Sequence, residues 1–467
     1  MKIELETIRD LYQKIRASLR VEGSFVRNSA WMFTSSGISI LIQFIFFTIL
    51  ARIYSPEVYG IYGIFNLYVN TLGNASTFGY HQAFVIPKEE REFSALLRIT
   101  LWIALFFSLG ITLITFIAGP QMLVQFQHEK LGNWVYWIGP TVFLFAMDRI
   151  CADWAIRNKE FRKQTLWSTT TMLVSKIFNA CYGFFISATV GGLVFTTLMQ
   201  HGMRSVTYAG SVIHDFSHQM KLRFSRNELM RVAREYKEFP LYIYWGNVIN
   251  IFSNNLPAAM LLSLGFGLES IGFYTYSLIV LDLPIRMLGA GIYSVFSQKA
   301  AELARERMHE LESHTWRLYQ GIVLVSLFFS LIVFAFGERL YLLLLDDKWQ
   351  VAGQAAEVLV IFYFFRMISS PLSSLFTTLR KEKQFFIFQV FLTVLRYGAL
   401  VLGAAWTDDF ISLMWVYTLV NAIAYFVFCI WIFRLINFSL IRVVIFTLGT
   451  TIPVFLLGWY IKTLLAP

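Results

Sequence analysis

Charged residues are scarce in this chain. Of its 467 residues, 15% are charged and 57% are hydrophobic, and the mean hydropathy is +0.59. A soluble protein of ordinary composition has about 25% charged residues. The deficit excludes a soluble globular enzyme, because one core could not keep so many apolar side chains away from water.

Cysteine is also scarce. Cys151, Cys181 and Cys429 all fall inside apolar segments, and their spacing fits neither a disulfide framework nor a metal site. The seven histidines show no ligand spacing either. We therefore expect no metal, no cofactor and no catalytic residues, and we do not expect an enzyme.

Long apolar runs recur along the whole chain. A helix of about 20 residues crosses a bilayer core of roughly 30 Å. We predict about thirteen such helices, at 27–50, 58–80, 94–118, 133–156, 166–189, 190–212, 240–264, 270–296, 317–338, 352–378, 384–405, 410–434 and 440–463. The sequence therefore predicts an all-α polytopic membrane protein with 12–13 transmembrane helices.

The net charge of +10 reflects membrane topology. Lysine and arginine collect in the N-terminal tail and in alternate connectors, such as those at 157–163, 221–237 and 380–383. The other connectors are short and carry few basic residues. This is the positive-inside pattern, which places the N-terminus in the cytoplasm. Because the pattern accounts for the basic excess, we expect no nucleic-acid partner.

The chain divides into two halves. The pattern E-x-x-G-x-Y opens the second apolar run at Glu57 and the eighth run at Glu269. Matching positions in two six-helix halves favour a duplication, with the substrate site between the halves. The predicted units are an amphipathic surface helix at 1–26, an N-lobe at 27–212, a linker at 213–239, a C-lobe at 240–436 and an extra helix at 437–467.

Polar side chains recur at helical spacing inside three of the predicted helices. The stripes are Asn66, Asn70 and Asn74; Asn247, Asn250 and Asn254; and Ser36, Ser39 and Gln43. Any one stripe is equally well explained by hydrogen bonds between helices. Three stripes, on the first two helices of one half and the first of the other, predict the polar lining of a shared central cavity.

Five cations lie inside predicted helices, where a central charge costs roughly 2.5–3.5 kcal/mol on insertion scales. They are Arg149, Lys176, Arg286, Arg366 and Arg396. Ion pairing is one explanation, with Asp148, Asp282 and Glu357 as candidate partners on the helices of Arg149, Arg286 and Arg366.

Pairing leaves Lys176 and Arg396 without an acidic partner on their own helices. We therefore predict a cationic cavity near the bilayer centre. Such a cavity suits an anionic cargo, and the planar fork of arginine suits a pyrophosphate in particular.

The motifs YKEFP, NNLP, ESIGFY, LPIRMLG and VFSQ occur in order between residues 236 and 302. Together with the N-terminal ILARIYSPEVYG, this stretch resembles the polysaccharide-biosynthesis family of O-antigen and exopolysaccharide flippases. That family belongs to the multidrug/oligosaccharidyl-lipid/polysaccharide exporter superfamily. Arg286 lies inside the matching stretch. The other four cations are predicted as site residues only from their depth in the helices.

The resemblance implies two MATE-like six-helix lobes in a V around a central cavity, with transport by alternating access. It implies a cargo of undecaprenyl-pyrophosphate-linked oligosaccharide, moved across the bacterial inner membrane. The implied partners are this lipid-linked oligosaccharide, membrane lipids, and polysaccharide polymerase or assembly proteins.

Other functions stay open at this point. A drug exporter or a lipid II exporter would share the fold, although a cationic centre disfavours organic cations. A polymerase or ligase would need catalytic groups on a large outer loop, and the longest outer connectors, 119–132 and 338–351, hold no acid/base pair. A scaffold subunit of a polysaccharide synthase is the remaining alternative.

Overall fold

The computed structural model describes residues 25–158, 160–211, 219, 222–288, 292–306 and 308–465. In this part of the chain all regular elements are helices. The amphipathic helix expected at 1–26 lies outside the described residues except for its last two positions. The first part of the expected linker lies outside them as well.

Each of the thirteen predicted transmembrane segments contains a helix. The N-lobe helices are α2 (Phe25–Ile53), α3 (Pro56–Ala75), α4 (Glu90–Gln125), α5 (Ile138–Arg157), α6 (Phe161–Phe185) and α7 (Val190–Ser211). The C-lobe helices are α10 (Tyr244–Met260), α11 (Leu268–Leu288), α12 (Ser294–Glu306), α13 (Met308–Leu344), α14 (Gln350–Ser369), α15 (Ser374–Thr378), α16 (Glu382–Trp406) and α17 (Phe410–Leu435). A last helix, α18 (Leu440–Leu465), follows the C-lobe.

Eight helical segments in the described ranges are long and apolar enough to cross a membrane, which agrees with a multi-pass membrane protein. One of them is Leu440–Leu464, so the thirteenth predicted segment meets the same criterion as the others. Helix α2 contributes a shorter apolar stretch, Gly37–Ile53. The other four predicted transmembrane segments, which contain α3, α6, α7 and α10, fall short, and each of these helices carries several polar residues in its sequence.

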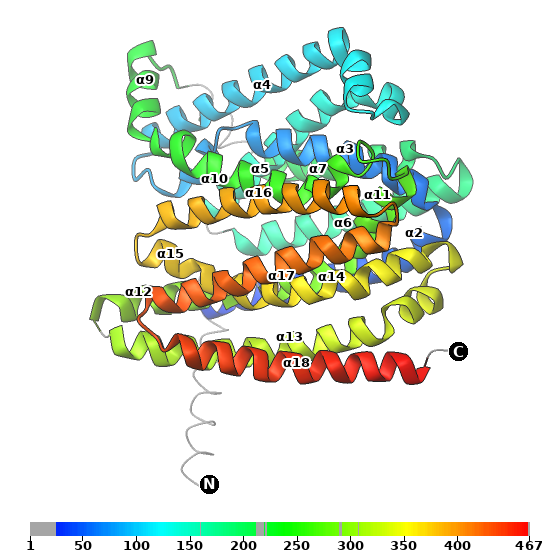
Figure 1. Ribbon diagram of the computed structural model, residues 1–467. Coiled ribbons are helices and arrows are strands. Elements are labelled where there is room, and N and C mark those ends of the chain that lie inside the picture. The colour runs from blue at the N-terminus through cyan, green and yellow to red at the C-terminus, as the bar shows by residue number, and fades with distance from the viewer. Residues whose placement is uncertain are drawn as a thin grey trace.

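The two lobes repeat one packing pattern. In the N-lobe, α5 packs on α3, α4 and α7, and α6 packs on α2 and α7. In the C-lobe, α14 packs on α11, α13 and α17, and α16 packs on α10 and α17. The five helix pairs correspond one to one, as expected for a duplicated six-helix unit. Helix α18 is added to the C-lobe along α13 and α17 (Figure 1).

One predicted segment is interrupted within the described residues. The segment expected at 270–296 contains α11 up to Leu288 and the start of α12 at Ser294, and residues 289–291 between them lie outside the described ranges. The segment expected at 352–378 ends its main helix before Pro371, which cannot donate the next helical hydrogen bond.

The linker between the lobes contains a short helix, α9 (Arg226–Glu235), which packs against α4 at one end of the bundle (Figure 1). Ser225 and Glu228 form a capping box at its start. Glu228 also accepts a hydrogen bond from Arg91 of α4 (Nη2–Oε1, 2.8 Å). The backbone N–H of Ser225 and the Arg91 guanidinium hold the pKa of Glu228 below its usual value.

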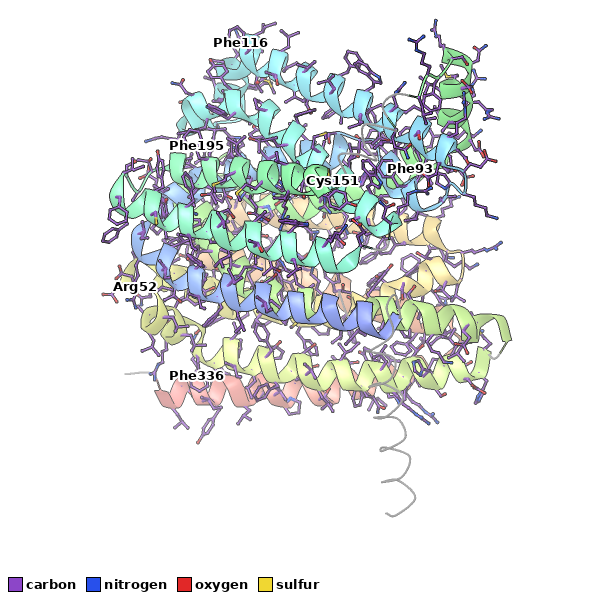
Figure 2. All side chains as sticks on the ribbon, turned by 180° about the vertical axis from the view of Figure 1, so that it is seen from behind. Arg52, Phe93, Phe116, Cys151, Phe195 and Phe336 are labelled. Carbon is purple, nitrogen blue, oxygen red and sulfur yellow. The ribbon has the colours of Figure 1, made fainter. Side chains whose placement is uncertain are left out.

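Exposed and buried side chains separate clearly in the N-lobe. Figure 2 shows Phe116 of α4 at the edge of the bundle and Cys151 of α5 among the N-lobe helices. Phe116 is 74% exposed and Cys151 is 6% exposed. A large exposed aromatic side chain is ordinary on a lipid-facing helix, so the outer face of α4 fits a bilayer rather than water.

Candidate functional site

The lobes meet closely where α3 and α11 begin. A Cβ atom added to Gly60 would lie 2.0 Å from the carbonyl oxygen of Leu268, and one added to Gly272 would lie 2.0 Å from that of Pro56. These glycines belong to the two E-x-x-G-x-Y motifs, and each contacts the residue just before the other motif. Only glycine fits at such a crossing. We call this end of the bundle the closed end.

Aromatic side chains fill the space beside the glycine contact. Trp349 is fully buried, and its Nε1 donates a hydrogen bond to the carbonyl oxygen of Ala51 (2.8 Å). The rings of Tyr276 and Tyr59 pack on Trp349 at centroid distances of 4.0 and 5.6 Å. The hydroxyl of Tyr276 also donates to the carbonyl oxygen of Phe47. The closed end is therefore a dry, packed contact between the lobes.

Further along the same two helices, polar residues replace the glycines. Asn70 and Asp282 each stand ten residues after the glycine of their motif, and Asn74 and Arg286 follow four residues later. At 100° per residue, Asn74 and Arg286 lie about 40° round the helix from the glycine, and Asn70 and Asp282 lie about 80° from it in the same direction. The face that closes one end of the bundle is therefore polar farther along it.

A cavity of about 260 Å³ lies between the lobes. We call it the interlobe cavity. Three residues predicted from the sequence line it: Asn74 and Arg149 from the N-lobe, and Asn250 from α10 of the C-lobe. His81, Gln82 and Tyr244 complete its polar lining. The structure thus brings polar residues of both lobes to one space, although no predicted cation other than Arg149 lines it.

The asparagine stripes also bond within their own helices. The Nδ2 atom of Asn74 donates to the carbonyl oxygen of Asn70 (2.7 Å), and that of Asn254 donates to Oδ1 of Asn250 (2.9 Å). Asn66 shares a hydrogen bond with the Tyr62 hydroxyl. The side chains of Ser36 and Asn247 lie outside the described residues. The stripes therefore combine local hydrogen bonding with the lining of the cavity.

Four of the five predicted cations form one group across the lobes. The group, which we call the cation cluster, comprises Lys176, Arg286, Arg366 and Arg396. Lys176 of α6 lies near enough to Arg286 of α11 for their charges to repel, and Arg366 stands in the same relation to Arg396. Asp282 joins the two halves of the cluster.

Asp282 is the one carboxylate that contacts the cluster among the described residues. Its Oδ2 lies 3.9 Å from Nη2 of Arg286, as the sequence spacing predicts, and its Oδ1 lies 3.7 Å from Nη1 of Arg366. Arg286 also donates to Oε1 of Gln43 on α2 (3.0 Å), and so bridges the lobes. Asp282 contacts two of the four cations, so the cluster keeps an excess of positive charge.

Arg396 differs from the other members because it is only 2% exposed. Its guanidinium donates to four neutral oxygen atoms, in Asn421 (2.7 Å), Ser253 (2.7 Å), Asn254 (3.0 Å) and Tyr425 (3.2 Å). The side chain of Arg286, by contrast, is 59% exposed. In this structure Arg396 is therefore enclosed within the C-lobe, and Arg286 is accessible to a ligand.

Arg149 lies apart from the cluster, and the ion pair suggested with its neighbour Asp148 is not the one formed. The Arg149 guanidinium lies over the ring of Phe145, 5.3 Å from its centroid. Asp148 instead binds His201 (2.8 Å) and Arg204 (3.4 Å) of α7. Adjacent residues on a helix point about 100° apart, so a pair at this spacing does not face each other.

The second correction concerns Glu357, which shares α14 with Arg366 but does not pair with it. Glu357 binds Lys462 of α18 and accepts the backbone N–H of Glu338 (2.8 Å). Nine residues separate Glu357 from Arg366, which places them far apart along the helix axis. Lys462 was missed because its partner lies 105 residues away in sequence.

The structure is that of a polytopic protein with a charged centre. It has two six-helix lobes, which pack closely at one end and have a group of cations between them. The family model described as "Polysaccharide biosynthesis protein" matches residues 49–354, which is more than half of the chain. The chain therefore belongs to this family. No curated protein matches the chain.

Solved structures share the fold at low sequence identity. An inward-facing multidrug resistance MATE family transporter of the MOP superfamily has a TM-score of 0.68 at 14% identity, over 87% of this chain and 94% of that one. The lipid II flippase MurJ, in an inward closed conformation, has a TM-score of 0.68 at 12% identity, over 94% and 96%. The predicted MATE-like arrangement of two lobes is confirmed.

Proposed function

We propose that the protein is a flippase for undecaprenyl-pyrophosphate-linked oligosaccharide, the repeat unit of an O-antigen or exopolysaccharide. It moves this lipid from the cytoplasmic to the outer face of the bacterial inner membrane. The observation that carries the proposal is the cation cluster, in which Arg286 and Arg366 share a single acid, Asp282, and Arg286 bonds to Gln43 of the other lobe.

The electrostatics favour an anionic ligand at this position. Moving a charged side chain out of water costs free energy, and an oppositely charged partner can offset this cost. Two cations that lie near each other also repel, which an anion between them would relieve. A pyrophosphate would bind between Lys176, Arg286 and Arg366, with arginine engaging its oxygens in bidentate fashion. Membership of the polysaccharide biosynthesis family supports a glycan attached to that pyrophosphate.

Alternating access accounts for the closed end. We place the closed end at the outer face, because the positive-inside pattern puts the linker and α9 in the cytoplasm. In this arrangement the polar faces of α3 and α11 would receive cargo from the cytoplasmic side. Separation at Gly60 and Gly272, with closure at the other end, would then release it outward.

Lipid II is the second candidate cargo, because it also carries an undecaprenyl pyrophosphate and because the fold matches a lipid II flippase. A drug exporter of organic cations fits less well, since the cation cluster would repel such a cargo. Polysaccharide polymerase or assembly proteins remain proposed partners for the release side.

Reconstitution tests the proposal directly. The purified chain would be placed in liposomes with fluorescently labelled undecaprenyl-pyrophosphate oligosaccharide, and label reaching the second leaflet would be measured with a membrane-impermeant reagent. We expect movement that depends on the protein. Lipid II and a cationic dye would be tested in parallel. Movement of lipid II alone would assign the protein to peptidoglycan synthesis, and movement of the dye alone would reject the proposed function.

A further inference from the structure

A second cavity, of about 280 Å³, lies inside the N-lobe between α5, α6 and α7. We call it the N-lobe cavity. Cys151, labelled in Figure 2, is one of its lining residues. The N-lobe cavity shares Arg149 with the interlobe cavity, so the two spaces adjoin. A ligand held between the lobes could therefore extend into it.

Hydrogen bonds between three helices form one wall of this cavity. Asp148 of α5 accepts from Nδ1 of His201 (2.8 Å) and from Nη1 of Arg204 (3.4 Å), both on α7. Nη2 of Arg204 donates to the hydroxyl of Ser168 on α6 (3.1 Å). Both bonds to Asp148 reach its Oδ2 atom, so Oδ1 retains capacity to accept a hydrogen bond from a ligand hydroxyl. The wall therefore offers fixed donors and acceptors side by side.

An aromatic surface lies in the same cavity. Trp167 of α6 lines it and is 37% exposed. The face of an indole ring is electron-rich, so it attracts the slightly positive C–H groups on one side of a sugar ring. Gln164, one turn before Ser168 on α6, adds an amide that both donates and accepts. Hydroxyl-binding groups beside an aromatic face are the chemistry that a sugar requires.

Other classes of ligand fit this cavity less well. The Asp148 carboxylate would repel a phosphate, although Arg149 and Arg204 are nearby. No group of three metal-ligating side chains occurs in the part of the chain that the structure describes. Pockets for drug-sized molecules measure roughly 300–1,000 Å³ and are mostly apolar, so a cavity of 280 Å³ suits a single polar ring.

We propose that the N-lobe cavity binds one sugar ring of the cargo, while the cation cluster binds its pyrophosphate. This inference rests on the proposed function and assigns the glycan to a different part of the protein from the phosphate. Asp148, His201 and Ser168 would bind ring hydroxyls, and Trp167 would pack against the face of the ring. Arg149, which lines both cavities, would contact the ligand where it passes from the interlobe cavity into the N-lobe cavity.

Binding of two lipids, one with and one without the sugar, distinguishes a test of this inference from a test of the proposed function. The full chain in lipid nanodiscs would be titrated with undecaprenyl pyrophosphate and with the same lipid carrying its oligosaccharide. We expect Trp167→Ala and His201→Gln each to weaken binding of the glycosylated lipid about ten-fold, in line with the loss of one good contact. Binding of the sugar-free lipid should not change, which also shows that these variants are folded.

Trp102→Ala is the matched control, because Trp102 lies on α4, is 51% exposed and lines neither cavity. It should bind both lipids as the unchanged protein does. Equal weakening of both lipids by Trp167→Ala, or no weakening of either, would overturn the assignment of the sugar to the N-lobe cavity. An unchanged protein that binds neither lipid would instead reject the proposed function and this inference with it.

Discussion

The N-lobe and the C-lobe share a packing plan but differ in charge. Corresponding helices make the same contacts in both lobes, and the motif glycines meet reciprocally at the closed end. Farther along the same face, α3 carries Asn70 and Asn74 where α11 carries Asp282 and Arg286. The N-lobe instead has charged residues on α5 and α7 around a cavity of its own: Asp148, Arg149 and Arg204.

This difference separates what the fold needs from what the site needs. A close helix crossing requires glycine in both lobes, because a side chain at either position would overlap a backbone oxygen. Packing alone does not require a charge on α11, since α3 occupies the equivalent position with neutral asparagines. We propose that the charges on α11 serve the ligand, and the predictions below test each side of the comparison.

The largest effect is expected at the closed end. Gly60→Ala and Gly272→Ala should each abolish transport, because the new Cβ would overlap a backbone oxygen of the other lobe. Overpacking of this kind costs about 1–3 kcal/mol or more in stability, so the temperature of unfolding should also fall. Transport in liposomes and thermal unfolding in detergent would measure the two effects.

Gly321→Ala is the control for this substitution. Gly321 lies inside α13, and a Cβ atom there would meet nothing within 4 Å. Alanine at this position should leave transport intact and stabilise the helix slightly. If all three alanine variants behaved alike, the glycine contact would not hold the lobes together.

The next effect is expected in the cation cluster. Arg286→Asn gives α11 the residue that α3 has at the equivalent position, and removes the more exposed arginine of the cluster. Transport should fall about 10–100-fold, as expected for loss of a charge-assisted contact of about 1.5–3 kcal/mol. The initial rate of lipid movement in liposomes is the measurement.

Arg442→Ala serves as the matched loss of one arginine, because Arg442 is exposed near the start of α18 and lines neither cavity. It should transport normally. Arg286→Lys should fall between Arg286→Asn and the unchanged protein, since lysine keeps the charge but not the planar fork. Normal transport by Arg286→Asn would show that transport does not need an arginine on α11 where α3 has an asparagine.

Substitution of Arg396 should lower the stability of the protein more than its binding of cargo. Arg396→Met would leave the buried oxygens of Asn421 and Ser253 without their donor, at a cost of about 1–3 kcal/mol for each buried group. The temperature of unfolding should fall, whereas Arg286→Asn should leave it nearly unchanged. Equal stability of Arg396→Met and the unchanged protein would show that the hydrogen bonds around Arg396 do not support the C-lobe.

The smallest effect on transport is expected where α18 joins the C-lobe. Lys462→Ala removes a half-exposed cation from Glu357, which keeps its hydrogen bond from the backbone of Glu338. Glu357 is only 4% exposed, so the loss of its cation costs more than the roughly 0–1 kcal/mol of a surface ion pair, and the temperature of unfolding should fall by several degrees. Transport should be unaffected, and a large loss of transport would mean that α18 belongs to the working bundle.

Much of the fold could be predicted from the sequence, because apolar length and helical period are local properties. All thirteen predicted segments contain helices, and the motif repeat at Glu57 and Glu269 marked the two helices that cross at the closed end. The interruption after Ser369 was missed. A run of apolar residues does not reveal a break when the residues on both sides stay in the bilayer.

The site was harder to predict, because its contacts join distant residues. The sequence placed Arg286 beside Asp282, but not beside Gln43, which is 243 residues away. It could not show that Arg396 is enclosed by neutral groups, or that Asp148 faces α7. His201 and Arg204 went unnoticed as members of the site, although a histidine and an arginine one turn apart inside an apolar helix are a signal of the kind that singled out the five cations.

One measurement tests the central claim most directly. Undecaprenyl pyrophosphate would be titrated into nanodiscs that hold the unchanged chain or the double variant Arg286→Asn, Arg366→Gln, with uncharged undecaprenol as the reference lipid. The account predicts binding of the pyrophosphate but not of undecaprenol by the unchanged chain, and an affinity at least ten-fold lower in the double variant. Equal affinity of both proteins for the pyrophosphate would contradict the claim that these cations bind the cargo.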